Sequence, residues 1–297
     1  MTELRIATRS SPLAKWQANR VAADLRQRWP GLRTRLVPVT AAADVDLATP
    51  LYRLGTVGVF CKEVQALVLS GAADCGVHSA KDLPTTLPDG LVMAAVLTRG
   101  DPRDALIGTP SIAALPSGAL IGTSSLRRQA QLAAARPDLR FVALRGNVQT
   151  RLAKIAQGEA TATILAQAGL MRLGLARAGT PLDPLVEMTP PPAQGAIAVD
   201  CRADDRLTRF RLAAIADRTT ATAIAIERTV LAGLAGGCSL PLGAHAWRAA
   251  DGWHLRIRLG TATRLVEGAW RGPAADLASQ ALAALRDGAE PKLVNPH

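Results

Sequence analysis

Short apolar runs alternate with helical patterns along the first two thirds of the chain. The first run covers residues 4–8, and Ser11 with Pro12 then offers a cap and a first-turn proline for a helix to about Trp29. Strands and helices in regular succession predict an α/β fold, in which helices cover a parallel sheet. The other strands expected here cover residues 33–39, 74–78, 91–97, 119–122, 141–144 and 161–165, and a helix is expected over residues 60–69.

Two breaks in this alternation suggest where domains end. The run Pro190-Pro191-Pro192 interrupts the pattern, and residues 197–201 then form a strand that we expect to return to the first sheet. From about Thr219 a long helix is followed by strands with no helix between them, which predicts an antiparallel sheet. We therefore expect a first α/β domain at residues 1–98 plus 196–215, a second at 102–190, and a small C-terminal α+β domain at 218–297.

The charge of the chain is basic, and arginine supplies most of it. Lysine plus arginine number 35 against 24 for aspartate plus glutamate, a net charge of +11 in 297 residues. Arginine favours planar anions, although a high-GC genome enriches arginine without any functional cause. With 3% aromatic residues the chain has little surface on which bases could stack, so nucleic-acid binding is disfavoured.

The start of the chain and its cysteines indicate the compartment. Met1 leads directly into the first strand without the apolar stretch of a secretory signal, and no apolar run is long enough to span a bilayer. Cys61, Cys75, Cys201 and Cys238 are far apart and form no metal-ligand spacing. We expect a cytoplasmic protein with no disulfide, no metal and no membrane contact.

Arginine and serine gather at turns where an expected strand gives way to a helix. Arg9 precedes Ser10-Ser11, the turn Thr123-Ser124-Ser125 precedes Arg127-Arg128, and Arg145-Gly146 precedes Arg151. Such a junction directs free backbone N–H groups and the positive end of the helix dipole to one place, where guanidinium groups grip carboxylates or phosphates. These turns predict a binding site for an acidic small molecule. Alternatively, the serines only cap helices whose arginines are solvated.

Three other segments carry possible chemistry. Lys81-Asp82 follows the strand at residues 74–78, at the strand end where α/β sheets bind ligands, and would pair a cation with a proton-handling carboxylate; a surface turn is the alternative. Cys238 follows Gly236-Gly237, which lets the backbone bring the thiol close to a ligand, although buried structural cysteines are more usual. Gln194 lies where the chain passes between domains, and a plain hinge turn is its alternative reading.

Taken together, these segments resemble the porphobilinogen deaminase (hydroxymethylbilane synthase) family from Arg5 to about Leu242. The runs that carry the resemblance occur in the family's order: Arg5-Ile6-Ala7-Thr8-Arg9, Val77-His78-Ser79-Ala80-Lys81-Asp82, Asp101-Pro102-Arg103-Asp104, Gly122-Thr123-Ser124-Ser125-Leu126-Arg127-Arg128-Gln129, Leu144-Arg145-Gly146-Asn147-Val148, Ala168-Gly169-Leu170-Met171-Arg172-Leu173-Gly174 and Gly236-Gly237-Cys238.

The resemblance implies a fold, a cofactor and a reaction. It implies two α/β domains built like type II periplasmic binding proteins, a third small α+β domain, and a dipyrromethane cofactor joined by a thioether to Cys238. It further implies a monomeric transferase of tetrapyrrole (heme) biosynthesis that joins four porphobilinogens head to tail into hydroxymethylbilane, releasing ammonia. Asp82 would be the catalytic residue. The residues implied to bind cofactor and substrate are Arg9, Ser11, Phe60, Ser79, Lys81, Thr123, Ser124, Ser125, Arg127, Arg128, Arg145, Gly146, Arg151, Arg172 and Gln194.

The chain departs from the family pattern at a few positions. Ala41-Ala42-Ala43-Asp44 replaces a usual Thr-x-Gly-Asp turn, and Val57 replaces a usual lysine; both lie in residues 40–59, which we expect to form a loop over the site. Ala193 stands where a glycine is usual before Gln194. The alternatives to the enzyme are therefore a catalytically weakened paralogue and a non-catalytic anion-binding protein of the same fold.

Overall fold

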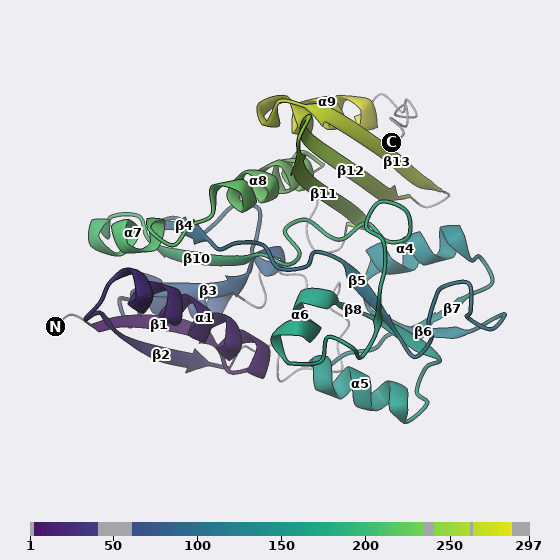
Figure 1. Cartoon of the computed structure of the whole chain (residues 1–297), viewed down its shortest axis with the longest axis horizontal. Helices are drawn as coiled ribbons and strands as arrows, with labels where there is room; N and C mark the ends of the chain where they lie inside the picture. Colours follow the sequence, from purple (N-terminus) through teal and green to yellow (C-terminus); the bar gives the residue numbers. More distant parts are fainter. Residues whose placement is uncertain (1–2, 41–60, 235–239, 262–263, 287–297) are drawn as a thin grey trace. The chain divides into compact units, whose positions relative to one another are not determined.

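The computed structural model (Figure 1) describes residues 3–40, 61–234, 240–261 and 264–286, and the chain divides into two compact units. Unit 2 contains residues of both the second and the third expected domain, so the division into three domains stays a prediction. Within the described residues, no helix is long and apolar enough to cross a membrane. Of the described residues, unit 1 comprises residues 3–40, 61–100 and 195–221, and unit 2 comprises residues 101–194, 222–234, 240–261 and 264–286.

Unit 1 is built on a five-stranded sheet of order β2-β1-β3-β10-β4. Strand β1 is parallel to β2 and β3, whereas β10 is antiparallel to β3 and β4. The return of residues 197–202 to the first sheet is thus confirmed. The expected parallel pairing is confirmed for β1, β2 and β3, but β10 is antiparallel to both of its neighbours, because it does not reach the sheet through a crossover helix from either of them. The strands are β1 (Glu3–Arg9), β2 (Arg33–Val39), β3 (Cys75–Ser79), β4 (Leu91–Val96) and β10 (Ile197–Arg202).

Helices cover both faces of this sheet. Alternate residues of β1 point to opposite faces, so Leu4 and Ile6 pack in the core cluster that contains Val21 and Leu25 of α1, while Ala7 packs with Val64 of α3. The helices of unit 1 are α1 (Pro12–Arg28), α3 (Lys62–Leu69), the short 3₁₀ helix η2 (Ala80–Asp82) and α7 (Arg206–Ala213).

Unit 2 contains a second five-stranded sheet, of order β7-β6-β8-β5-β9. Here β6 is parallel to β7 and β8, and β5 is antiparallel to β8 and β9. The strands are β5 (Asp104–Ile107), β6 (Leu120–Gly122), β7 (Arg140–Val142), β8 (Ala162–Ala166) and β9 (Thr180–Pro181), and the helices are α4 (Leu126–Ala135), α5 (Val148–Ala156) and α6 (Gln167–Arg172).

The two sheets share one arrangement. Strands β2, β1 and β3 of unit 1 correspond in order to β7, β6 and β8 of unit 2. In each sheet an antiparallel strand follows, β10 or β5, and an edge strand, β4 or β9, completes the sheet. The predicted class of two type II periplasmic-binding-protein-like α/β parts with a small α+β part is confirmed.

The remaining sheet of unit 2 is antiparallel, in the order β11-β12-β13, as the sequence predicts. Val230 of α8 and Leu277 of α9 pack against its apolar residues, among them Leu255 and Ile257. The elements are α8 (Arg218–Gly233), β11 (Leu242–Ala249), β12 (Gly252–Gly260), β13 (Leu265–Gly272) and α9 (Ala274–Arg286).

Candidate functional site

In unit 1, the carboxyl ends of β1 and β3 lie side by side because the two strands are parallel neighbours. Arg9 is the last residue of β1, Ser79 is the last of β3, and Asp82 ends η2 directly after it. All three belong to one small depression, so the structure brings these predicted residues together. The depression is lined by Arg9, Ala14, Gln17, Cys61, Val77, His78, Ser79 and Asp82.

Gln17 is a residue of this depression that the sequence analysis missed. Its amide Nε2 lies 2.9 Å from the Ser79 hydroxyl, and the side chain is almost fully buried. A buried amide beside a strand end is well placed to orient a polar ligand as well as Ser79. The available signal was one polar residue within the buried stripe of α1 that contains Ala14, Ala18 and Val21.

Ser11 and the η2 turn have local structural contacts. The Ser11 hydroxyl accepts a hydrogen bond from the backbone N–H of Ala14 at 3.3 Å and caps α1, as the alternative interpretation held. The Cys61 thiol donates to the backbone carbonyl of Asp82 at 3.3 Å, which ties the turn to the start of α3. Lys81 and Asp82 are both half-buried. Ligand binding by Ser11 and Lys81, and catalysis by Asp82, stay predictions.

Directly behind the depression lies a buried acid that the sequence analysis did not identify. Asp200 of β10 is fully buried, and its Oδ2 lies 3.1 Å from His78 Nε2 and accepts a 3.0 Å hydrogen bond from Gln65. Gly76 leaves room for this pair, because a Cβ there would lie 2.4 Å from the second oxygen of Asp200. The group fixes the residue that immediately precedes Ser79.

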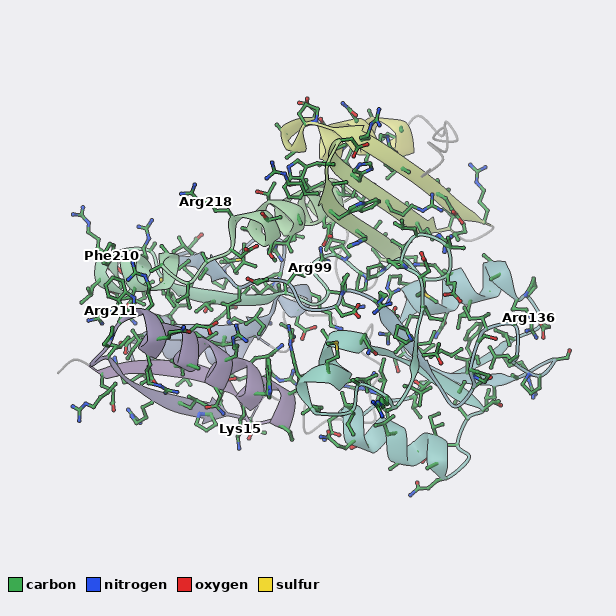
Figure 2. All side chains as sticks on the ribbon, in the orientation of Figure 1. Lys15, Arg99, Arg136, Phe210, Arg211 and Arg218 are labelled. Atoms are coloured by element: carbon green, nitrogen blue, oxygen red, sulfur yellow. The ribbon has the colours of Figure 1, made fainter. Side chains whose placement is uncertain are left out.

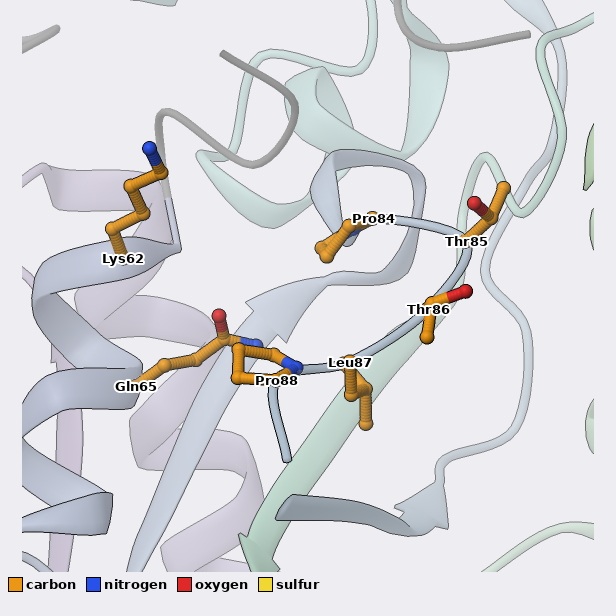
Figure 3. A pocket seen from close by; sticks show the side chains of 7 residues that line it. All are labelled: Lys62, Gln65, Pro84, Thr85, Thr86, Leu87 and Pro88. Atoms are coloured by element: carbon orange, nitrogen blue, oxygen red, sulfur yellow. The ribbon is translucent and has the colours of Figure 1, made fainter. Parts of the chain in front are cut away.

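A more open cavity of unit 1 lies beside α3 (Figure 3). It is lined by Lys62, Gln65 and residues 84–88, the segment that follows η2. None of the predicted site residues lines it.

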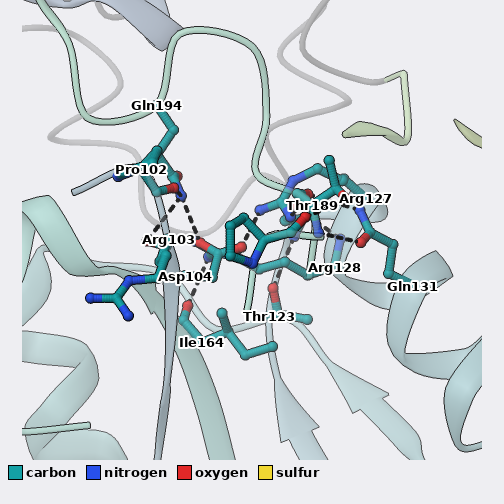
Figure 4. Close-up of polar contacts among 12 residues, drawn as sticks. Pro102, Arg103, Asp104, Thr123, Arg127, Arg128, Gln131, Ile164, Thr189 and Gln194 are labelled. Atoms are coloured by element: carbon teal, nitrogen blue, oxygen red, sulfur yellow. Dashed lines mark hydrogen bonds and ion pairs between the residues drawn. The ribbon is translucent and has the colours of Figure 1, made fainter. Parts of the chain in front are cut away.

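In unit 2, the predicted arginine pair at the start of α4 points inward to Asp104 (Figure 4). Arg127 Nη2 lies 2.7 Å from one Asp104 oxygen, and Arg128 Nη2 lies 2.7 Å from the other. Their Nη1 atoms donate to backbone carbonyls, Arg127 to Thr189 at 2.9 Å and Arg128 to Ile164 at 2.7 Å. The alternative in which this pair is solvated is therefore wrong, since both guanidinium groups are buried.

The electrostatics keep this cluster ionised. Burial by itself raises the pKa of Asp104, but the charges of Arg127 and Arg128 and hydrogen bonds from Arg128 and Gln194 outweigh burial and hold that pKa well below its usual range. Burial lowers the pKa of Arg127, and the charge of Asp104 opposes that change. One aspartate thus neutralises only part of the charge of two arginines.

The hydroxyl groups before α4 make local hydrogen bonds. Ser125 accepts from the Arg128 N–H at 3.5 Å and caps the helix, Thr123 accepts from the Ser125 N–H at 3.2 Å, and Ser124 donates to the Leu144 carbonyl at 3.4 Å. These bonds match the capping alternative. Whether the same hydroxyl groups also bind a ligand stays a prediction.

The second arginine turn of unit 2 leads into α5. Gly146 has φ +121°, and a Cβ there would lie 2.7 Å from Thr150, so this position requires glycine. The Arg151 Nε donates to the Gly146 carbonyl at 2.8 Å, and Arg145 is half-buried beside it. At the end of α6, burial lowers the pKa of Arg172 to about 10, which leaves it charged at neutral pH.

Gln194 is fully buried, and its Nε2 donates to Asp104 Oδ1 at 3.0 Å and to the Pro102 carbonyl at 2.8 Å. It therefore supports the arginine cluster from the opposite side. Other predicted positions lie outside the described residues: Phe60, Cys238, Ala41 to Asp44 and Val57. Within the described ranges, no group of three or more His, Cys, Asp or Glu residues has the geometry to hold a metal ion.

The basic surplus extends well beyond these turns, as the side chains in Figure 2 show. Lys15 and Arg218 are exposed, whereas Arg136 forms an ion pair with Asp138 at 2.8 Å. Surface arginines of this kind need no functional explanation, in contrast to the buried pair at α4.

These two sheets of matching strand order, each with charged residues at its strand ends, define a type II periplasmic-binding-protein-like α/β fold. The sequence profile described as "Porphobilinogen deaminase, dipyromethane cofactor binding domain" matches residues 4–209. The chain belongs to the porphobilinogen deaminase family.

Two relatives and one solved structure illustrate what the chain is similar to. It is 49% identical to the porphobilinogen deaminase of Xanthomonas oryzae pv. oryzae (strain KACC10331 / KXO85), over 93% of this chain and 92% of that one. It is 51% identical to the porphobilinogen deaminase of Xanthomonas axonopodis pv. citri (strain 306), over 84% of each chain. A TRAP periplasmic solute binding protein from Desulfovibrio salexigens aligns with a TM-score of 0.44 at 11% identity, over 72% of each chain.

Proposed function

We propose that this protein is a porphobilinogen deaminase, which joins four porphobilinogen molecules head to tail into hydroxymethylbilane and releases ammonia. The observation that carries the proposal is the family match over residues 4–209, because that stretch contains Asp82 and every arginine turn. The near full-length similarity to named deaminases supports it. Nothing among the described residues favours a non-catalytic binding protein.

The reaction needs a group that stabilises positive charge. When the aminomethyl C–N bond of porphobilinogen breaks, the electron pair leaves with nitrogen and the pyrrole becomes an electron-deficient azafulvenium. The exocyclic carbon then bonds to the free α-carbon of the acceptor pyrrole, and that carbon loses its proton. A fixed carboxylate would assist both steps if it accepted a hydrogen bond from the pyrrole N–H and then took up the proton that the acceptor carbon loses. Asp82, in the depression with Arg9 and Ser79, is suited to this role.

The substrate also needs groups that bind its carboxylates. Every pyrrole carries an acetate and a propionate, so the growing chain brings many negative charges into one site. Arg145, Arg151 and Arg172 are suited to bind them, because they lie at helix ends in unit 2 and bind planar anions bidentately. Arg127 and Arg128 would contribute the charge that Asp104 leaves uncompensated.

The residues present fit the dipyrromethane cofactor that the family binds. Its four carboxylates require several cations, and unit 2 supplies them at the starts of α4 and α5 and at the end of α6. When bound, the group supplies the terminal pyrrole carbon to which the first substrate unit is added. We assign its attachment to the thiol of Cys238. We further assign the protein to the cytoplasm as a monomer, with porphobilinogen as its small-molecule partner.

Intact-mass spectrometry of the purified protein tests this proposal. A chain from a host that makes porphobilinogen should exceed the sequence mass by two linked pyrrole units, and it should release ammonia from porphobilinogen. Cys238→Ser should lose both properties, whereas Cys201→Ser, which alters a buried cysteine of β10, should keep them. A wild-type chain with neither the added mass nor ammonia release would overturn the proposal.

A further inference from the structure

A fully buried glutamate on α8 joins two segments that lie far apart in the sequence. Glu227 Oε2 accepts a 2.6 Å hydrogen bond from the backbone N–H of Ala193, and Oε1 accepts a 2.7 Å bond from the backbone N–H of Ala246 on β11. His245 Nδ1 lies 3.7 Å from the same carboxylate. A buried carboxylate is tolerated only when it is hydrogen-bonded, and bonds of this kind are stronger than neutral ones.

Ala193 has an unusual backbone conformation at the point where Glu227 holds it. Its φ is +63°, and it is the one non-glycine residue with positive φ in the described part of the chain. The left-handed region is unfavourable for an alanine, so surrounding contacts must hold the residue there. The bond to Glu227 is such a contact, because it fixes the direction of the Ala193 N–H.

The next residue along the chain connects this strained position to the arginine pair. Gln194 donates to Asp104 Oδ1 at 3.0 Å, and Asp104 binds Arg127 and Arg128. The other end of the same segment also contacts the pair, since Arg127 donates to the Thr189 carbonyl. All of these residues belong to unit 2.

We propose that Glu227 is a positioning residue, which holds Ala193 in its left-handed conformation and thereby sets Gln194, Asp104 and the two arginines that begin α4. This inference rests on the proposed function, in which the α4 turn binds substrate carboxylates.

The test compares the wild type, Glu227→Gln, Ala193→Gly and the double variant, with all four proteins prepared as holoenzymes. Glutamine has one acceptor oxygen for two backbone donors, so Ala193 loses its clamp and the arginines lose their fixed orientation. We expect kcat/KM for porphobilinogen to fall on the order of tenfold or more, mainly through KM. Glycine adopts φ +63° without a clamp, so Ala193→Gly should restore most of that loss while changing the wild-type enzyme little.

If Glu227 only stabilised the fold, its substitution would lower stability and leave KM unchanged. Ile257→Val, a core substitution of β12, should lower the midpoint of thermal unfolding without shifting KM. Hydrogen exchange of the Ala193 and Gln194 amides, measured by mass spectrometry on peptides, should accelerate in Glu227→Gln. If exchange is unchanged, or if Ala193→Gly gives no rescue, the inference is wrong. If the wild-type protein carries no two-pyrrole mass and releases no ammonia, the proposed function fails instead, and hydrogen exchange still decides whether the clamp exists.

Discussion

Both five-stranded sheets bury an aspartate on their antiparallel strand, yet the two acids have different neighbours. Asp104, the first residue of β5, lies opposite Ala166 at the carboxyl end of β8, and it binds two guanidinium groups. Asp200 of β10 lies opposite Gly76, further from the strand ends; it accepts a hydrogen bond from Gln65 and lies 3.1 Å from His78 Nε2.

The two sheets share one strand order but place their buried acid differently. In unit 2 the buried acid lies at the strand ends, where it orients two arginines and leaves the α4 turn with a net positive charge. In unit 1 the buried acid lies away from the strand ends, so the carboxylate near the strand ends is Asp82, which follows β3 and lies in the same depression as Arg9. If the proposed function holds, unit 2 would mainly bind carboxylates, whereas unit 1 would supply the carboxylate for the chemical steps.

The largest expected effect tests that assignment for unit 1. Asp82→Asn should keep the cofactor mass but lower the rate of ammonia release by about 10²- to 10⁴-fold, because an amide neither stabilises the cationic intermediate nor accepts its proton. Ammonia release and intact mass are measured on the same preparation. Asp89→Asn, a loop substitution in unit 1, is the matched control and should have normal turnover. Normal turnover by Asp82→Asn would remove Asp82 from the mechanism.

The next effect concerns stability and contrasts the two buried acids. Asp104→Asn leaves two buried guanidinium groups without their counter-charge, and we expect a loss of about 3–5 kcal/mol in the free energy of unfolding. Asp200→Asn keeps an acceptor for Gln65 and should cost only about 1–3 kcal/mol. Urea unfolding of both variants at neutral pH measures this difference. Equal losses would show that the arginine pair does not depend on Asp104.

The same cluster has a definite pH dependence. Because the folded-state pKa of Asp104 lies below its unfolded value, its contribution is present above the unfolded pKa of about 3.9 and is lost as pH falls toward the folded value. The stability gap between wild type and Asp104→Asn should therefore shrink as the pH is lowered below about 4. A gap that widens with acid would contradict the ionised cluster.

The sequence predicted most of the fold but only part of these clusters. Strands such as β1 and β2 were predictable because an alternating or buried apolar run carries its own signal. The strand β5 was missed because it has four residues and begins with an acid, and the direction of β10 depends on chain connection instead of local composition.

For the site, the turns were predictable because caps and glycines are local. The inward orientation of Arg127 was not, since its partner Asp104 is 23 residues away and was given no role from the sequence. The buried pair of His78 and Asp200 was missed as well: an acid within an apolar strand is a signal of a special position, but its partner on another strand cannot be inferred from the sequence. Such pairings are set by the folded arrangement of the strands.

A smaller effect tests how unit 1 accommodates its buried acid. Gly76→Ala would place a Cβ 2.4 Å from Asp200 and 2.9 Å from His78 Nε2, so one of the two must move. We expect a loss of about 1–3 kcal/mol in stability, the usual range for overpacking, together with reduced turnover because Ser79 follows His78 directly. Thermal unfolding and ammonia release measure the two effects. Gly272→Ala is a suitable control, since no heavy atom lies within 4 Å of its added Cβ.

The smallest effect compares the two helix caps. Ser11 caps α1 in unit 1 and Ser125 caps α4 in unit 2, so alanine at either position should cost about 0.5–2 kcal/mol of stability. If unit 2 is the main carboxylate-binding part, Ser125→Ala should also raise KM for porphobilinogen severalfold more than Ser11→Ala. Thermal unfolding and steady-state kinetics on both variants separate capping from binding. Loss of a cap lowers stability at either position, so only KM reports on binding. Equal KM values in the two variants would contradict a main carboxylate-binding role for unit 2.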